Sequence, residues 1–124
     1  MNLQLSLKKK WFDMTKAGIK TEDYRDINEY WFCRLFRDVD KKELPYILKG
    51  LQDGRSIEWV GLFHLHFLKD FTRNTMTLGY PKSGDKERIL KLEHKGIKIR
   101  TGNPEWGAEP NKLYFVILHG CSVE

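Results

Sequence analysis

The sequence has few cysteines, no long apolar run and no internal repeat, and each absence excludes a class of protein. Two cysteines in 124 residues are too few for the disulfide framework of a small secreted domain. No apolar run approaches the roughly 18 residues that cross a bilayer. The first residues also lack the order of a secretory signal, because a lysine cluster follows a very short apolar stretch. We therefore expect a cytoplasmic protein whose thiols, Cys33 and Cys121, are reduced and half-buried.

Spacings typical of metal sites are also missing. No C-x-x-C or H-x-x-x-H pair occurs, and no further ligand stands at a suitable spacing from His64 and His66. We expect both histidines to be ordinary structural residues, and we expect no cofactor.

What is present is a globular composition with a mild excess of positive charge. Hydrophobic residues make up 40% of the chain and charged residues 31%, which excludes intrinsic disorder. The length is typical of one domain, so we expect a single domain over residues 1–124. Twenty-two Lys and Arg against seventeen Asp and Glu give a net charge of +5. This charge permits a phosphate-bearing partner without requiring one.

Helical spacing of apolar residues predicts three helices in the first half of the chain. The expected helices cover residues 8–17, 29–36 and 41–51, and the nearly continuous apolar run of 29–36 also allows a strand. Gly18 suits the end of the first helix, since that place favours a residue that tolerates positive φ. Asp40 is the expected N-cap of the third.

Strands are expected at the start of the chain and through its second half. The alternation of L-Q-L-S-L at residues 3–7 places three leucines on one face. Further strand-like segments are residues 21–27 (or an extended loop), 57–67, 71–78, 88–93, 96–100 and 113–118, with a clear turn over 80–86. Five to six strands with helices in the first half predict an α+β fold, a small and partly closed β-barrel with flanking helices.

The densest polar segment follows the first helix. If it is extended, Lys20 and Glu22 share one face, while Thr21, Asp23 and Arg25 share the other. Arg25 can then bind a phosphate or carbonyl, Lys20 can act as donor or base, and Asp23 can orient them. The alternative, which spacing alone favours, is a solvated surface strand with mutual salt bridges.

A second candidate site is the Gly- and Pro-rich loop over residues 101–111. Trp106 can stack on a base, while Glu105 or Glu109 accepts hydrogen bonds from an exocyclic amine. The alternative is that Trp106 closes one end of the barrel as a core residue. The remaining large aromatics assigned to the core are Trp11, Phe12, Trp31, Phe36, Trp59 and Phe115.

Both ends of the chain resemble ASCH domains, small β-barrels of the PUA-like superfamily. The N-terminal quarter contains L-S-L-K-K-K-W-F-D-M-T-K-A-G-I-K-T-E-D-Y-R, and the family signature is a helix followed by G-x-K-x-x-E-x-R. Gly18, Lys20 and Arg25 match this signature, and the acidic place falls on Asp23 with Glu22 beside it. The last fifth contains G-N-P-E-W-G-A-E-P-N-K-L-Y-F-V-I-L-H-G, which resembles a phage- and bacteria-associated branch of the family.

The resemblance implies a cleft that binds RNA or a modified nucleoside beside the signature segment. We therefore expect an RNA- or nucleotide-binding domain. Its cleft would be lined by Lys20, Thr21 and Arg25, with Trp106 and Glu109 contributed by the later loop.

The resemblance also leaves an enzyme open. Some relatives are amidohydrolases that deacylate N4-acetylcytidine with a Lys and a Thr of the signature and a downstream Glu. Lys20 matches the lysine, but Asp23 stands in the threonine place, so that nucleophile is missing. A small amidohydrolase or a ribonuclease would instead use Lys20, Asp23 and Glu105. A third, non-catalytic alternative is a phage or host accessory protein whose aromatic surface binds another protein.

Overall fold

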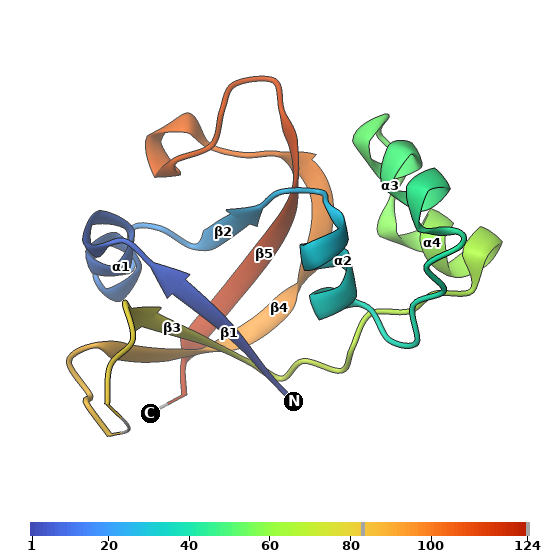
Figure 1. Cartoon of the computed structure of the whole chain (residues 1–124). Coiled ribbons are helices and arrows are strands. Elements are labelled where there is room, and N and C mark those ends of the chain that lie inside the picture. The colour runs from blue at the N-terminus through green and yellow to red at the C-terminus, as the bar shows by residue number, and fades with distance from the viewer. Residues whose placement is uncertain (83, 124) are drawn as a thin grey trace. The chain divides into compact units, whose positions relative to one another are not determined.

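The computed structural model describes residues 1–82 and 84–123 and confirms the expected α+β class. This part of the chain holds four α-helices, one short 3₁₀ helix and one five-stranded mixed sheet (Figure 1). The elements are β1 (Asn2–Leu7), α1 (Lys9–Lys16), β2 (Glu22–Arg25), α2 (Glu29–Leu35), α3 (Leu44–Gln52), α4 (Ile57–His64), β3 (Arg73–Leu78), β4 (Ile89–Thr101), η1 (Pro104–Trp106) and β5 (Leu113–Ser122). The strand order is β1-β3-β4-β5-β2. Ser83, part of the expected turn over 80–86, lies outside the described residues.

The chain divides into two compact units that are each built from separate segments. The first unit comprises Met1–Asp23, Asp70–Gly96 and the residues from Leu118 onward. The second comprises Tyr24–Lys69 and Ile97–Ile117. Because β2, β4 and β5 each cross a boundary, both units draw residues from these strands.

The first unit is built around the leucine row of β1. Leu3, Leu5 and Leu7 are buried, as the alternation predicts. β1 pairs in parallel with β3, which pairs antiparallel with β4 (Figure 1). Phe12 of α1 is also buried. The helix ends at Lys16 with Ala17 as its C-cap. Gly18 follows with a φ of 77°, as expected, and its N–H donates to the Thr15 carbonyl at 3.1 Å.

The second unit has an aromatic and aliphatic core. Phe32 and Phe36 stack with ring centroids 4.1 Å apart, and Phe36 also meets Phe115 at 6.4 Å. The buried face of α3 contributes Ile47 and Leu51. The core assignments of Phe12, Phe36 and Phe115 are therefore confirmed.

The segment 57–67, predicted as a strand, is mostly the helix α4. Ser56 caps it, because its side-chain oxygen accepts a hydrogen bond from the Trp59 N–H at 3.2 Å. The chain then turns at Leu65, which ends the helix in the left-handed conformation with φ 57°. The alternating apolar residues at the end of this segment therefore do not lie on a sheet face.

Two further boundaries differ from the prediction. The third helix begins at Leu44 rather than after Asp40. Asp40 instead closes a separate turn, since its carboxylate accepts from the Lys42 N–H at 2.9 Å and its carbonyl from the Glu43 N–H at 3.2 Å. In the second half, the two short strands expected on either side of His94 are one strand of 13 residues, β4.

The three tryptophans assigned to the core are only half-buried, and each has a cation over its ring. The pairs are Lys10 on Trp11 at 4.8 Å, Arg25 and Arg34 on Trp31 at 5.1 and 5.0 Å, and Arg55 on Trp59 at 5.9 Å. A cation over a ring face at this range is attracted by the ring quadrupole. The core assignment was wrong because each ring keeps one face available for a charged neighbour.

Both cysteines are free thiols; Cys33 is half-buried, whereas Cys121 is exposed rather than half-buried. None of the helices in the described residues is long and apolar enough to span a membrane.

Candidate functional site

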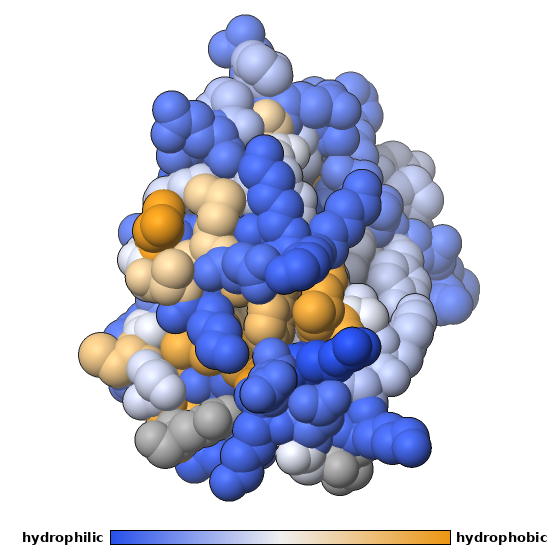
Figure 2. Space-filling model, turned by 90° about the vertical axis from the view of Figure 1, so that its left-hand side faces the viewer, coloured by the Kyte–Doolittle hydropathy of each residue, from blue (hydrophilic) through white to orange (hydrophobic). Residues whose placement is uncertain are grey.

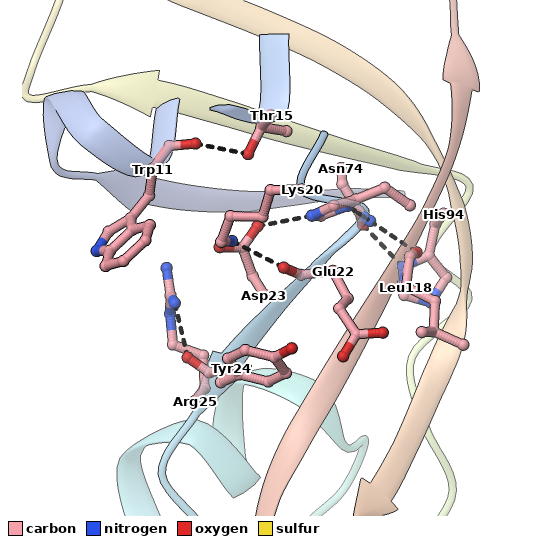
Figure 3. A network of polar contacts seen from close by, with 11 residues as sticks. Trp11, Thr15, Lys20, Glu22, Asp23, Tyr24, Arg25, Asn74, His94 and Leu118 are labelled. Atoms are coloured by element: carbon pink, nitrogen blue, oxygen red, sulfur yellow. Dashed lines mark hydrogen bonds and ion pairs between the residues drawn. The ribbon is translucent and has the colours of Figure 1, made fainter. Parts of the chain in front are cut away.

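Lys20 and Asp23 form a buried ion pair in the first unit (Figure 3). Their side chains are 2% and 3% exposed. The Lys20 ammonium also donates to the Glu22 carbonyl oxygen at 2.7 Å. The two residues lie together because β2 begins only at Glu22, so the alternation expected from residue 20 onward does not separate their side chains. The ammonium thus contacts protein atoms, and its part in ligand binding stays a prediction.

Asp23 remains ionised although it is buried. Burial by itself raises the pKa of Asp23, but the hydrogen bond from His119 and the charge of Lys20 outweigh it and lower the pKa from 3.8 to about 2. The site therefore holds a carboxylate whose charge is balanced by Lys20.

The second oxygen of Asp23 binds His119 of β5. The Nε2 atom of His119 lies 2.6 Å from Oδ2 of Asp23, and Nδ1 lies 2.8 Å from Nδ2 of Asn74. The same Asn74 nitrogen donates to the Leu118 carbonyl oxygen at 3.2 Å (Figure 3). A carbonyl only accepts, so this contact fixes which end of the Asn74 amide faces His119. In this arrangement Nε2 of His119 donates to Asp23 and Nδ1 accepts from Asn74.

Asn74 passes this orientation on to His94 of β4. Its Oδ1 lies 2.7 Å from Nδ1 of His94. An amide oxygen accepts, so His94 carries its proton on Nδ1 and presents a lone pair at Nε2. Burial lowers the pKa of His94 below its usual 6.5. The network Lys20–Asp23–His119–Asn74–His94 thus ends in a half-buried imidazole base.

The backbone explains how these residues meet. Asn74 lies in β3, on the same inward row as Met76, and both are 0% exposed. The ladder places Asn74 opposite Leu3 of β1 and Leu92 of β4. No buried side-chain nitrogen or oxygen among the described residues lacks a hydrogen-bond partner. A fully satisfied network of this kind holds its members in one arrangement.

The second unit carries a different polar feature, which we call the arginine–aromatic cluster: Arg25, Tyr30, Trp31 and Arg34. Both guanidinium groups lie over the Trp31 ring, and that of Arg34 also lies 5.8 Å from the Tyr30 ring. Tyr30 meets Trp31 edge to face at 5.3 Å and is 60% exposed. The cluster comes from β2 and α2, where Tyr30 and Arg34 are one helical turn apart. It offers two guanidinium groups next to an exposed ring.

The loop expected to hold a stacking tryptophan also belongs to the second unit. Residues Pro104–Trp106 form the 3₁₀ helix η1, capped by Asn103, whose side chain accepts from the Glu105 N–H at 2.9 Å. Trp106 is half-buried, and Glu105 and Glu109 are exposed.

The structure therefore divides the predicted site residues between the two units. Lys20, Thr21 and Asp23 are in the first, where Thr21 is exposed. The second holds Arg25, Glu105, Trp106 and Glu109. The sequence analysis did not identify Asn74, His94 or His119. One signal could have indicated them: Asn74 is a polar residue on the inward row of a strand.

No family model, curated protein or solved structure matches the chain. Among the described residues, no group of three or more His, Cys, Asp or Glu side chains is placed to hold a metal ion.

Proposed function

We propose that the protein is a cytoplasmic, ASCH-like domain that binds RNA or a nucleotide-like ligand through its arginine–aromatic cluster. The observation that carries this proposal is the pair of guanidinium groups of Arg25 and Arg34, 5.1 and 5.0 Å from the Trp31 ring. Guanidinium forks match phosphate oxygens, and an exposed ring such as that of Tyr30 gives a base a face to stack on.

The signature segment supports the proposal in a modified form. Arg25 is its last residue and belongs to the cluster, whereas Lys20 and Asp23 are occupied with each other. Asp23 and Arg25 share the strand β2, so the ion pair anchors the strand that carries the ligand-binding arginine. Trp106 and Glu109 belong to the same unit as the cluster and remain candidates for further base contacts.

The test is a titration of fluorescently labelled single-stranded RNA at low ionic strength. Arg25→Ala and Arg34→Ala are each expected to weaken binding about tenfold, because each removes a charge-assisted hydrogen-bond donor. Neutralising two phosphates should give a slope of about −1.4 in log affinity against log salt.

The matched control is Arg55→Ala. It removes the same charge from the same unit, and Arg55 also lies over a tryptophan, Trp59, at 5.9 Å. We expect RNA affinity within about twofold of the unmodified protein, since that cation lies outside the cluster. Equal weakening by all three variants, or no binding at low salt, would contradict the proposal.

A second candidate function is hydrolysis, and the oriented imidazole of His94 favours it. With its proton fixed on Nδ1 by Asn74, His94 has Nε2 ready to take a proton from water or a hydroxyl. A nucleoside amidohydrolase or a ribonuclease needs such a base. In this alternative Lys20 and Asp23 are positioning residues, and both belong to the same unit as His94.

Incubation with N4-acetylcytidine and with RNA, followed by chromatography, tests this alternative. His94→Gln is expected to abolish turnover, and the rate should fall on the acid side as His94 becomes protonated. His64→Gln is the control, because His64 faces Glu43 at 3.3 Å in the second unit. Unchanged substrates, or turnover that survives His94→Gln, would eliminate the enzyme.

A further inference from the structure

A cavity in the first unit is not part of either site described above. Its volume is 810 Å³, within the usual range of about 300–1,000 Å³ for small-molecule sites. Residues of β1, β3 and β4 line it together with the loop that follows β3. Every lining residue in the part of the chain that the structure describes belongs to the first unit. Hydrophilic side chains cover most of the protein face shown in Figure 2.

The floor of the cavity is a row of hydrogen-bonding side chains across three strands. Gln4 of β1 stands opposite Thr75 of β3, and Thr75 stands opposite Lys91 of β4. These residues alternate with the buried Leu3, Leu5 and Met76, so they project from the other face of the sheet. Thr75 is held in place because its hydroxyl donates to Oδ1 of Asn2 at 2.7 Å. An amide, a hydroxyl and an ammonium group are thus side by side.

The charge of the cavity is positive. Lys86 and Lys91 line it, and no Asp or Glu does so among the described residues. Neither lysine forms an ion pair within residues 1–82 and 84–123, in contrast to lysines such as Lys95, which lies 3.5 Å from Glu93. Two cations gathered without a carboxylate favour an anionic ligand.

An aromatic ring stands at the same cavity. Tyr80 is 100% exposed and is followed by Pro81, which also lines the cavity. A fully exposed ring is available to stack on a planar group of a ligand, as aromatic side chains do with nucleic-acid bases.

We propose that this cavity binds a nucleoside monophosphate. The phosphate lies between Lys86 and Lys91, the sugar and the base edge bond to the row formed by Gln4 and Thr75, and the base stacks on Tyr80. This site is independent of the RNA-binding proposal, because the arginine–aromatic cluster belongs to the other unit.

The experiment is a calorimetric titration of the full chain with the four common ribonucleoside monophosphates. Adenosine, ribose 5-phosphate and inorganic phosphate serve as partial ligands. We expect at least one monophosphate to bind at least about tenfold more tightly than any of the three, because only it engages the lysines and the ring together. Backbone amide shifts in two-dimensional NMR should concentrate at Thr75, Thr77 and Lys91. Binding that inorganic phosphate matches would overturn the proposal, as would no binding.

Matched variants locate the ligand. Lys91→Ala is expected to weaken monophosphate binding about tenfold through loss of a phosphate contact. Lys95→Ala, which removes a paired lysine from the same strand, should leave it unchanged. Tyr80→Ala should weaken binding of the monophosphate but not of ribose 5-phosphate. An equal effect of the two lysine variants would overturn the cavity assignment.

The cluster variants separate this proposal from the proposed function. Arg25→Ala and Arg34→Ala should retain full monophosphate affinity even where RNA binding is lost. If either abolishes monophosphate binding, the ligand occupies the arginine–aromatic cluster and the cavity proposal is wrong. If RNA binding fails altogether while Lys91→Ala still weakens monophosphate binding, only the proposed function is contradicted.

Discussion

At the residue scale, the buried pair of Lys20 and Asp23 is costly to break but not a large net source of stability. Desolvating two charges offsets most of their attraction, whereas removing one partner leaves the other charge buried without compensation. The pair therefore specifies one conformation of the segment that leads into β2. It does so inside a network in which His119 and Glu22 take up the remaining hydrogen bonds.

We predict that Lys20→Met lowers the free energy of unfolding by about 3–5 kcal/mol, because Asp23 loses its counter-charge in a buried place. Urea unfolding measures this loss. Lys9→Met is the control, since Lys9 pairs with Asp13 at 2.7 Å but the two side chains are 76% and 54% exposed. That variant should change stability by less than about 1 kcal/mol. Equal effects of the two substitutions would show that the Lys20 ammonium is solvated.

The two histidines of the network have assigned tautomers, which long-range ¹⁵N–¹H NMR spectra read directly. We predict a proton on Nε2 of His119 and on Nδ1 of His94 at neutral pH. His66 provides an internal reference for the second pattern, because its Nδ1 donates to the His64 carbonyl and its Nε2 accepts from the Asp40 N–H. A proton on Nδ1 of His119 would contradict the orientation derived for Asn74.

Only part of this site could be predicted from the sequence. Lys20 and Asp23 are three positions apart, so a local polar pattern indicates them. His119 is 96 positions from Asp23 and 45 from Asn74, and only the sheet brings them together. Local periodicity carries no information on such contacts. The sequence therefore predicted that Lys20 faces a ligand, because it does not show the buried groups that surround the Lys20–Asp23 pair in the fold.

At the element scale, capping decided what apolar patterning left ambiguous. Short apolar runs suit a strand and a buried helix equally well, and the segment that became α4 is one of them. Its N-cap, Ser56, is a helix signal that the alternation of Phe63, Leu65 and Phe67 obscured. In contrast, β1 and α1 were predicted correctly. The alternation of period two is clear in β1, and a glycine, Gly18, marks the end of α1.

The end of α4 makes a measurable prediction. Leu65 is 74% exposed and has φ 57°, a conformation that its Cβ disfavours. Leu65→Gly should therefore raise the free energy of unfolding by about 0.5–1 kcal/mol, despite the greater freedom of glycine in the unfolded chain. Leu62→Gly, at an equally exposed position inside the helix, should lower it by about 1 kcal/mol. Thermal unfolding followed by circular dichroism compares the two, and destabilisation by both would refute the strain at Leu65.

At the scale of the whole molecule, the perturbed groups make stability depend on pH in a definite direction. Burial lowers the pKa of His94 below 6.5, and the pKa of Asp23 is about 2 despite its burial. Both groups bind a proton more readily in the unfolded chain. Stability is therefore fully present above about pH 7 and falls as the pH is lowered. The step from Asp23, between about pH 4 and pH 2, is worth about 2 kcal/mol.

Urea unfolding at about pH 7.5, 5 and 3 checks this dependence, and we expect the free energy of unfolding to decrease at each step. His94→Gln serves as the control, because it should remove the decrease between the first two values and keep the later one. On the alkaline side, the hydrogen bond with Asp26 raises the pKa of Lys112. The stability that this raised pKa contributes is lost as the pH rises from the usual lysine pKa through the raised one. A stability that is constant from neutral to acid pH would contradict the burial of Asp23 as a carboxylate.

The enclosure of Lys20 also has a consequence for its chemical reactivity. An amine-reactive acylating reagent modifies the unprotonated amine form of lysines that it can reach, such as Lys9 and Lys49, whose side chains are 76% and 77% exposed. Lys20 is 2% exposed and bound to a carboxylate, so in the folded chain the reagent should leave it unmodified. The extent of Lys20 acylation, read from a peptide mass spectrum, therefore measures the fraction of molecules in which this segment has unfolded. Lys20 thus reports folding without an added probe.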